Sequence, residues 1–121
     1  MHKIQFINFP NIALDPKHLI LWLEDLCAHF NVSIEQFAVH FIGKDKMLEM
    51  NQKYLNHDTH TDILTFDYGN QQVINAELFV SEYMCGLNAF ENAQSIEDES
   101  LRLISHGFFT HNWFFRQKTR R

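Results

Sequence analysis

The sequence contains few of the residues that break secondary structure or cross-link a chain. Among its 121 residues are four glycines, two prolines and two cysteines. It has no internal repeat and no glycine- or proline-rich linker, which is typical of a globular chain. Cys27 and Cys85 lie far apart and form no CxxC pattern. We therefore expect two reduced thiols packed in a core, and no disulfide or zinc knuckle.

Long hydrophobic runs are also missing. No apolar stretch approaches the roughly 20 residues that cross a membrane, and the first residues lack a basic segment followed by an apolar one. Neither membrane insertion nor secretion is indicated. We expect a cytoplasmic protein with no membrane partner.

Acidic residues are absent after Glu99, although the chain as a whole carries a net charge of -5. Residues 1–115 hold six basic and fifteen acidic groups, a balance of -9, and the remaining basic residues are Arg116, Lys118, Arg120 and Arg121. An acidic body argues against tight nonspecific binding of nucleic acid, which depends on neutralising phosphates. The basic end can contact RNA, although such an end is more commonly solvated.

Hydrophobic patterning predicts an alternation of strands and helices. Asp15 is expected to cap the first helix, with Pro16 at its first position. Ser95 and Asp98 have the spacing of a capping box for the last helix. We predict strands over 4–9, 37–42, 61–66 and 73–80, the last two joined by a turn over 68–72, and helices from 16, over 44–54, over 82–94 and from 96. This order gives a single α+β domain, in which helices pack on a mixed sheet of about four strands.

The first predicted helix has a clear apolar face. We expect the following side chains to point into the core: Leu19, Trp22, Leu23, Leu26 and Phe30.

The last predicted helix contains a histidine, His106. Leu101, Ile104 and Phe108 form an apolar stripe, and His106 falls at its edge. A helical pair of metal ligands needs a second histidine four residues on, but that position is Thr110, and His111 lies about 140° further round the helix. Spacing alone therefore favours a partly buried structural histidine over a ligand.

The other concentration of reactive groups is the segment from residue 57 to residue 62. His57, Asp58 and His60 have the chemistry of metal ligands or of acid and base catalysts, but the same residue types also form solvated turns. Asp62 is more informative. It opens an apolar strand, where a carboxylate has no packing role.

Three segments resemble the YbeY family of bacterial endoribonucleases that mature ribosomal RNA. Residues 50–66, MNQKYLNHDTHTDILTF, resemble the family segment LN..YR.KD..TDVLSF. Residues 76–81, AELFVS, resemble the strand GDI.IS, and residues 101–108, LRLISHGF, resemble the start of the metal motif HGxLHxxGxxH/D. The order of elements agrees from residue 1 to about residue 108.

The resemblance implies a function and a site. In such proteins zinc is held by a histidine at the position of His106, a second histidine four residues on, and a His or Asp ten residues on. The metal activates water against an RNA phosphodiester. The resemblance further implies that Thr61 and Asp62 contact substrate. It also implies a role in maturing the 3' end of 16S rRNA and in ribosome quality control, with rRNA and the small ribosomal subunit as partners.

The chain departs from the motif after His106. Thr110, Trp113 and Arg116 stand where the family has His, Gly and His or Asp, and Leu55 replaces a common arginine. Residues 108–118 can be written back as codons. If one T is deleted near Phe109, the shifted reading frame permits the sequence FLHTIGFSDK, and the glycine in it is the only residue that its codon allows. That reading restores the whole motif, so we interpret the end of the chain as frame-shifted.

We therefore predict an endoribonuclease domain over residues 1–108 and an atypical aromatic and basic tail over residues 109–121. Trp113, Phe114 and Phe115 are expected to lie outside the core, because no helix places three consecutive rings and the adjacent cations on one face. With one zinc ligand of three, this chain is expected to bind zinc weakly and cleave RNA poorly. The alternative is a catalytically silent RNA- or ribosome-binding protein.

Overall fold

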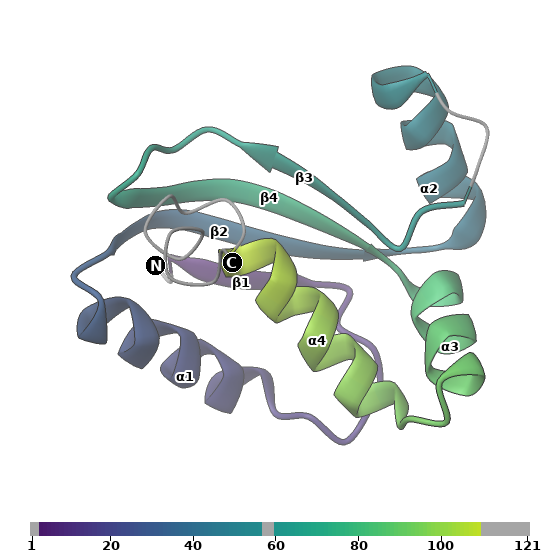
Figure 1. Ribbon diagram of the computed structural model, residues 1–121, viewed down its shortest axis with the longest axis horizontal. Helices are drawn as coiled ribbons and strands as arrows, with labels where there is room; N and C mark the ends of the chain where they lie inside the picture. The colour runs from purple at the N-terminus through teal and green to yellow at the C-terminus, as the bar shows by residue number, and fades with distance from the viewer. Residues whose placement is uncertain (1–2, 57–59, 110–121) are drawn as a thin grey trace.

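The computed structural model describes residues 3–56 and 60–109, which form a four-stranded mixed sheet with helices packed on it (Figure 1). The strands are β1 (Ile4–Ile7), β2 (Ser33–Ile42), β3 (Ile63–Asp67) and β4 (Val73–Ser81). The helices are α1 (Pro16–His29), α2 (Lys44–Met50), α3 (Glu82–Glu91) and α4 (Ile96–Phe109), and a π-helical turn, η1 (Asn51–Leu55), extends α2. The predicted α+β class is confirmed.

The strand order β1-β2-β4-β3 combines two kinds of pairing. β1 and β4 both run parallel to β2, with Ile4 opposite Phe37 and Phe37 opposite Ala76. β3 runs antiparallel to β4 through the predicted hairpin. Parallel pairs need long crossover connections, which α1 and the segment from α2 to β3 supply. β3 therefore forms one edge of the sheet.

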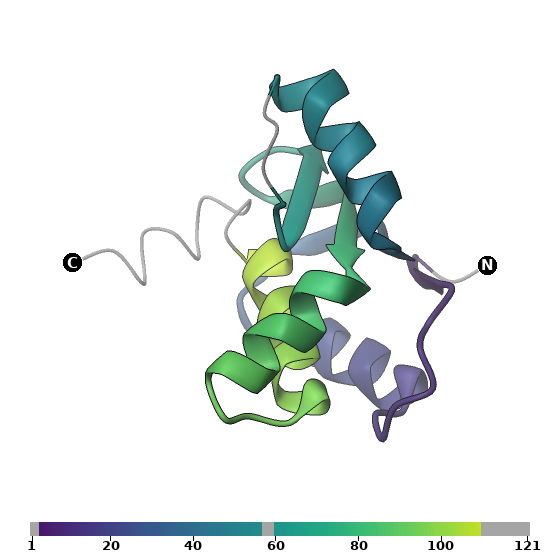
Figure 2. The same cartoon turned by 90° about the vertical axis from the view of Figure 1, so that its right-hand side faces the viewer.

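Helices α1 and α4 lie side by side on one face of the sheet (Figures 1 and 2). Their inward side chains join alternate residues of the central strands in the main core, whose largest fully buried members include Phe37, Leu23, Leu78, Ile104 and Phe108. The Phe37 and Phe108 rings meet edge to face, 4.8 Å apart. α2 packs on the opposite face through Met47 and Met50, against Leu64. The last turn of α4 is thus anchored in the core.

The structure contains both helix caps that the sequence predicts. The Asp15 carboxylate accepts the backbone N–H of Lys17 at the start of α1, and the Ser95 hydroxyl accepts that of Asp98 at the start of α4. Both contacts satisfy an N–H that has no partner inside the helix. Cys27 and Cys85 are buried free thiols, as expected.

Several predicted boundaries are wrong. β1 ends at Ile7, and Asn8 then takes a left-handed conformation with φ of 58°. α3 ends at Glu91, shortly before Ala93, which is also left-handed. β2 begins at Ser33, because its pairing with β4 starts there, and β3 begins only at Ile63, so Thr61 and Asp62 precede it.

Trp22 was also placed wrongly. Its side chain is 39% exposed, and its ring lies edge-on to Phe109 at 6.2 Å. Leu19, Leu23 and Cys27 form the buried line of α1, and position 22 falls beside that line. The ring therefore covers the end of α4 from outside the core.

Phe109, the first residue of the predicted tail, is described and ends α4, whereas residues 110–121, with the three consecutive aromatic residues, lie outside the described residues. The boundary after residue 108 therefore stays a prediction. No helix in residues 3–56 and 60–109 is long and apolar enough to cross a membrane.

Two helical glycines provide a matched test of this packing. A Cβ on Gly107 would lie 2.6 Å from Leu78 Cδ1, whereas a Cβ on Gly86 would meet nothing within 4 Å. We expect Gly107→Val to lower the free energy of unfolding by about 1–3 kcal/mol through overpacking. Gly86→Ala should raise it by about 0.5–1 kcal/mol. Urea unfolding measures both. A Gly107→Val protein as stable as the parent would contradict the close contact of α4 with β4.

Candidate functional site

Helix α4 has one buried face and one exposed face. Leu103, Ile104 and Phe108 are buried, whereas Arg102 and His106 are exposed. Residues four apart lie above one another on a helix, so Arg102 and His106 follow each other along the same face. The expectation that His106 is partly buried is therefore wrong. Its imidazole is presented at the surface by a helix end that the core holds.

The guanidinium of Arg102 is fixed by a buried acid. Glu99, three residues earlier on α4, is only 1% exposed. Arg102 donates to both of its carboxylate oxygens, from Nε to Oε1 at 2.9 Å and from Nη2 to Oε2 at 2.6 Å. Such a two-pronged contact fixes direction as well as distance. The side chain of Arg102 remains 53% exposed, so the outer edge of the guanidinium faces solvent.

Asp62 reaches the same group from the position just before β3. Its Oδ1 accepts the backbone N–H of Ile63 at 2.8 Å, and its Oδ2 accepts from Asn88 Nδ2 at 3.2 Å. Oδ2 also lies 3.8 Å from Arg102 Nη2. Asn88 further donates to Glu99 Oε2 at 3.2 Å. These four side chains, here called the polar bridge, connect β3, α3 and α4.

Thr61 is held by a different contact. Its hydroxyl accepts from Nδ2 of Asn51 at 2.7 Å, and Asn51 is fully buried at the beginning of η1. The π-helical turn therefore ties the end of α2 to the residue before Asp62. Such turns recur at functional sites, where they re-aim a side chain. Asp62 thus lies beside Arg102, which precedes His106 by one helical turn, whereas the hydroxyl of Thr61 is held by Asn51.

The polar bridge contains more acidic than basic groups. Hydrogen bonding to Arg102 lowers the pKa of Glu99, an effect that burial opposes and Asn88 reinforces. The same contact with Glu99 raises the pKa of Arg102. Two carboxylates and one guanidinium leave one net negative charge. The polar bridge can therefore orient a phosphate through the exposed edge of Arg102, but its own charge attracts anions little.

A metal site was expected around His106. Within residues 3–56 and 60–109, no three His, Cys, Asp or Glu side chains are placed to hold one ion. His57 and Asp58 of the polar segment, together with Thr110, His111 and Arg116, lie outside the described residues. The described donors do not fit a three-ligand zinc centre.

Glu77 belongs to a separate polar group. Its neighbours Ala76 and Leu78 point into the main core, so Glu77 faces the opposite side of the sheet. There it accepts from the Tyr68 hydroxyl at 3.1 Å and lies 3.1 Å from His40 Nε2. This part of the family resemblance is thus on the face that α4 does not cover.

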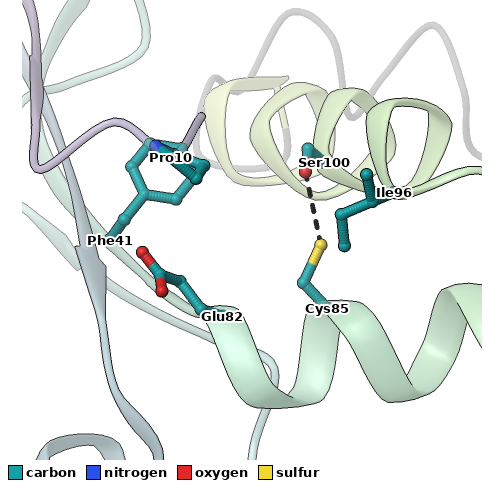
Figure 3. Close-up of a pocket in the computed structure, with 6 residues that line it drawn as sticks. All are labelled: Pro10, Phe41, Glu82, Cys85, Ile96 and Ser100. Atoms are coloured by element: carbon teal, nitrogen blue, oxygen red, sulfur yellow. Dashed lines mark hydrogen bonds between the residues drawn. The ribbon is translucent and has the colours of Figure 1, made fainter. Parts of the chain in front are cut away.

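A cavity of about 180 Å³ lies beside α3 (Figure 3). Its lining residues are Pro10, Phe41, Glu82, Cys85, Ile96 and Ser100. Cys85 Sγ lies 3.3 Å from Ser100 Oγ, and burial is the main cause that raises the pKa of the thiol. The thiol is protonated at neutral pH and is a poor nucleophile. The described lining does not include Thr61, Asp62 or His106, so this cavity is not their site.

Sequence reasoning missed Asn88, Glu99 and Arg102. Glu99 had a visible signal, because it falls on the buried stripe of α4, three residues before an arginine. An acid at a core position with a basic residue one turn on indicates a buried ion pair. Asn88 had no such signal, since only the crossing of α3 and α4 places it beside Asp62.

Comparisons with known proteins agree with the resemblance noted above. The profile of the family described as Endoribonuclease YbeY matches residues 11–111. A protein of that name from Phocaeicola vulgatus is 37% identical over 88% of this chain and 75% of its own length. Another protein of that name, from Bacteroides thetaiotaomicron, is 35% identical over 88% of this chain and 76% of its own length. The solution structure of a Thermotoga maritima protein matches with a TM-score of 0.61 at 23% identity, over 89% of this chain and 70% of that one.

Acid should weaken the polar bridge. The pKa of Glu99 is lowered from its ordinary value of 4.5, so its stabilising contribution is complete above that pH and is lost as the pH falls through the lowered pKa. We expect Glu99→Gln to lower the free energy of unfolding at neutral pH by roughly 1–3 kcal/mol and to flatten its decline in acid. Urea unfolding from neutral pH to below pH 4.5 measures this. Glu91→Gln, at an exposed site on α3, is the control. Parallel pH profiles for Glu99→Gln and the parent would contradict the role of Glu99.

Proposed function

Because this chain belongs to the YbeY family of endoribonucleases, we propose that it acts on single-stranded RNA in the maturation of ribosomal RNA. The observation that carries the proposal is the placement of Asp62 and Arg102 beside the exposed face of α4, one turn before His106. A phosphodiester laid along this face meets the free edge of a guanidinium whose direction Glu99 fixes. Arginine held in this way binds phosphate oxygens with defined geometry.

In this proposal each described residue has a limited task. Arg102 binds and orients the phosphate, and the Asp62 carboxylate keeps the guanidinium from rotating away. Thr61, held by Asn51, offers a hydroxyl next to Asp62 in the chain. His106 provides the one imidazole that matches the family's metal motif. A bound zinc ion in this family would supply an activated water.

The donor set supports a second element of the proposal, which is that this chain is impaired. A catalytic zinc ion takes three protein ligands. His106 matches the first motif position, but Thr110 and Arg116 stand at the other two, and neither side chain is a usual zinc ligand. No catalytic step is therefore assigned to a metal in this chain. A frame-restored chain would recover the ligands.

We infer that the RNA is the 3' end of 16S rRNA, and that the partner is the small ribosomal subunit in the cytoplasm, with a role in ribosome quality control. An alternative is a silent protein that binds RNA or the ribosome without cleaving it. The incomplete ligand set favours that alternative for the chain as written. Its basic tail, Arg116 to Arg121, lies outside the described residues.

Zinc affinity tests the impairment. We expect the chain as written to bind zinc at least about 100-fold more weakly than a variant carrying Thr110→His, Trp113→Gly and Arg116→Asp, because even outer-shell changes cost 10- to 100-fold. Only the restored variant should cleave single-stranded RNA. Competition with a chromogenic chelator measures the affinity. The control is His111→Ala in the chain as written, which should change nothing. Equal, tight binding by both proteins would show that His111, or the histidines of residues 57–60, complete the site.

Asp62 is tested in the restored variant. Asp62→Asn should slow RNA cleavage on the order of 10- to 100-fold, because small misplacements of a bound group have effects of that size. Thermal unfolding should change little, since asparagine keeps the shape and one acceptor. Asp67→Asn, at the other end of β3, is the matched control. A collapse of the fold in Asp62→Asn would instead identify Asp62 as a structural cap.

A further inference from the structure

A second group of exposed side chains comes from three segments of the chain, one of which leads into Asp62. Lys44 at the start of α2, Tyr83 at the start of α3 and His60 before β3 come from three separate elements. Lys44 Nζ lies 4.5 Å from the centre of the Tyr83 ring. The His60 and Tyr83 rings are 5.8 Å apart and inclined at 59°. Figures 1 and 2 show that the starts of α2 and α3 meet at the same end of the sheet. This group is here called the Tyr83 cluster.

The Tyr83 cluster is tied to the candidate site through the backbone. The N–H of Ser81 donates to the carbonyl oxygen of Asp62 at 2.9 Å. Tyr83 follows Ser81 by two residues, and His60 precedes Asp62 by two. The cluster and the polar bridge therefore flank the same short stretch of backbone.

Core packing does not explain these side chains. Tyr83 is 44% exposed, and Lys44 and His60 are also exposed. Proteins that bind single-stranded nucleic acids present exposed aromatic rings beside cationic side chains. A base stacks on the ring, and the cation pairs with the phosphate. A contact between a lysine and an exposed ring is weak, so Lys44 can turn to a phosphate at little cost.

We propose that the Tyr83 cluster binds one unpaired nucleotide of the RNA, with its base stacked on Tyr83 and its phosphate paired with Lys44. The proposal rests on the function proposed above and adds to it a reason for acting on single strands. A base can reach the Tyr83 ring only when it is not stacked inside a duplex. Asp45 and Glu82 adjoin the cluster in sequence and offset its positive charge. Stacking, more than charge, therefore supplies the affinity.

The experiment measures the affinity of the chain as written for a short fluorescein-labelled single-stranded RNA by fluorescence anisotropy. Tyr83→Ala should weaken binding roughly 5- to 100-fold, the range expected for losing one stacked base. Tyr83→Leu should do the same, because it keeps an apolar side chain without a ring, whereas Tyr83→Phe should bind as the parent does. Phe90→Ala is the matched control, since Phe90 is an aromatic residue on α3 that is 84% exposed.

The role of Lys44 is tested by the salt dependence of the same binding. Lys44→Gln should weaken binding and reduce the slope of log affinity against log salt by about 0.7, the value for one phosphate contact on a single strand. Lys46→Gln, on the same helix, should leave the slope unchanged. Annealing the RNA to its complement should abolish the effect of Tyr83→Ala.

Two failures can be told apart. If the parent chain binds no single-stranded RNA, the proposed function fails and this inference fails with it. If the parent binds but folded Tyr83→Ala binds as tightly as Phe90→Ala, only the nucleotide site at Tyr83 is refuted. Equal affinity for single-stranded and duplex RNA would refute it as well, because duplex bases cannot stack on the ring.

Discussion

The arrangement of the site depends on one carboxylate that is removed from water. Glu99 is buried at the first turn of α4, where its charge is stabilised only if donors reach it. Arg102 and Asn88 supply them, and both then bind or approach Asp62. Because an unpaired buried Glu99 would be strongly destabilising, its hydrogen bonds hold α3, α4 and the start of β3 in fixed positions relative to one another. A surface ion pair would not do this, because solvent screens it and either side chain can leave.

Much of the framework could be predicted from local sequence. Asp15 and Ser95 have the chemistry that caps a helix, and the 68–72 turn between two apolar runs indicated the hairpin. The family resemblance singled out Thr61 and Asp62 as substrate contacts, and that role stays a prediction. The polar bridge was not predicted, because it joins residues 26 and 11 positions apart in sequence, such as Asn88 to Asp62 and to Glu99. The burial of Trp22 was predicted wrongly because helical periodicity shows which side of α1 is apolar but not how wide the buried stripe is.

The described part of α4 is held in place by core packing. Leu103, Ile104 and Phe108 are buried in the core, and these residues precede every position where the chain departs from the family's metal motif. Packing of the described domain therefore does not require the missing ligands. A change after Phe108 can remove chemistry while the surface that would receive RNA keeps its shape.

The sheet order also has a consequence for how the chain folds. The hairpin of β3 and β4 and the contact of α3 with α4 join residues close in sequence, whereas β2 must be inserted between β1 and β4, which lie far from each other in the chain. Local contacts lose less chain entropy and form sooner than distant ones. Asp62, Asn88, Glu99 and Arg102 all fall within the local part. The polar bridge is therefore expected to assemble early and to guide the later docking of the parallel strands.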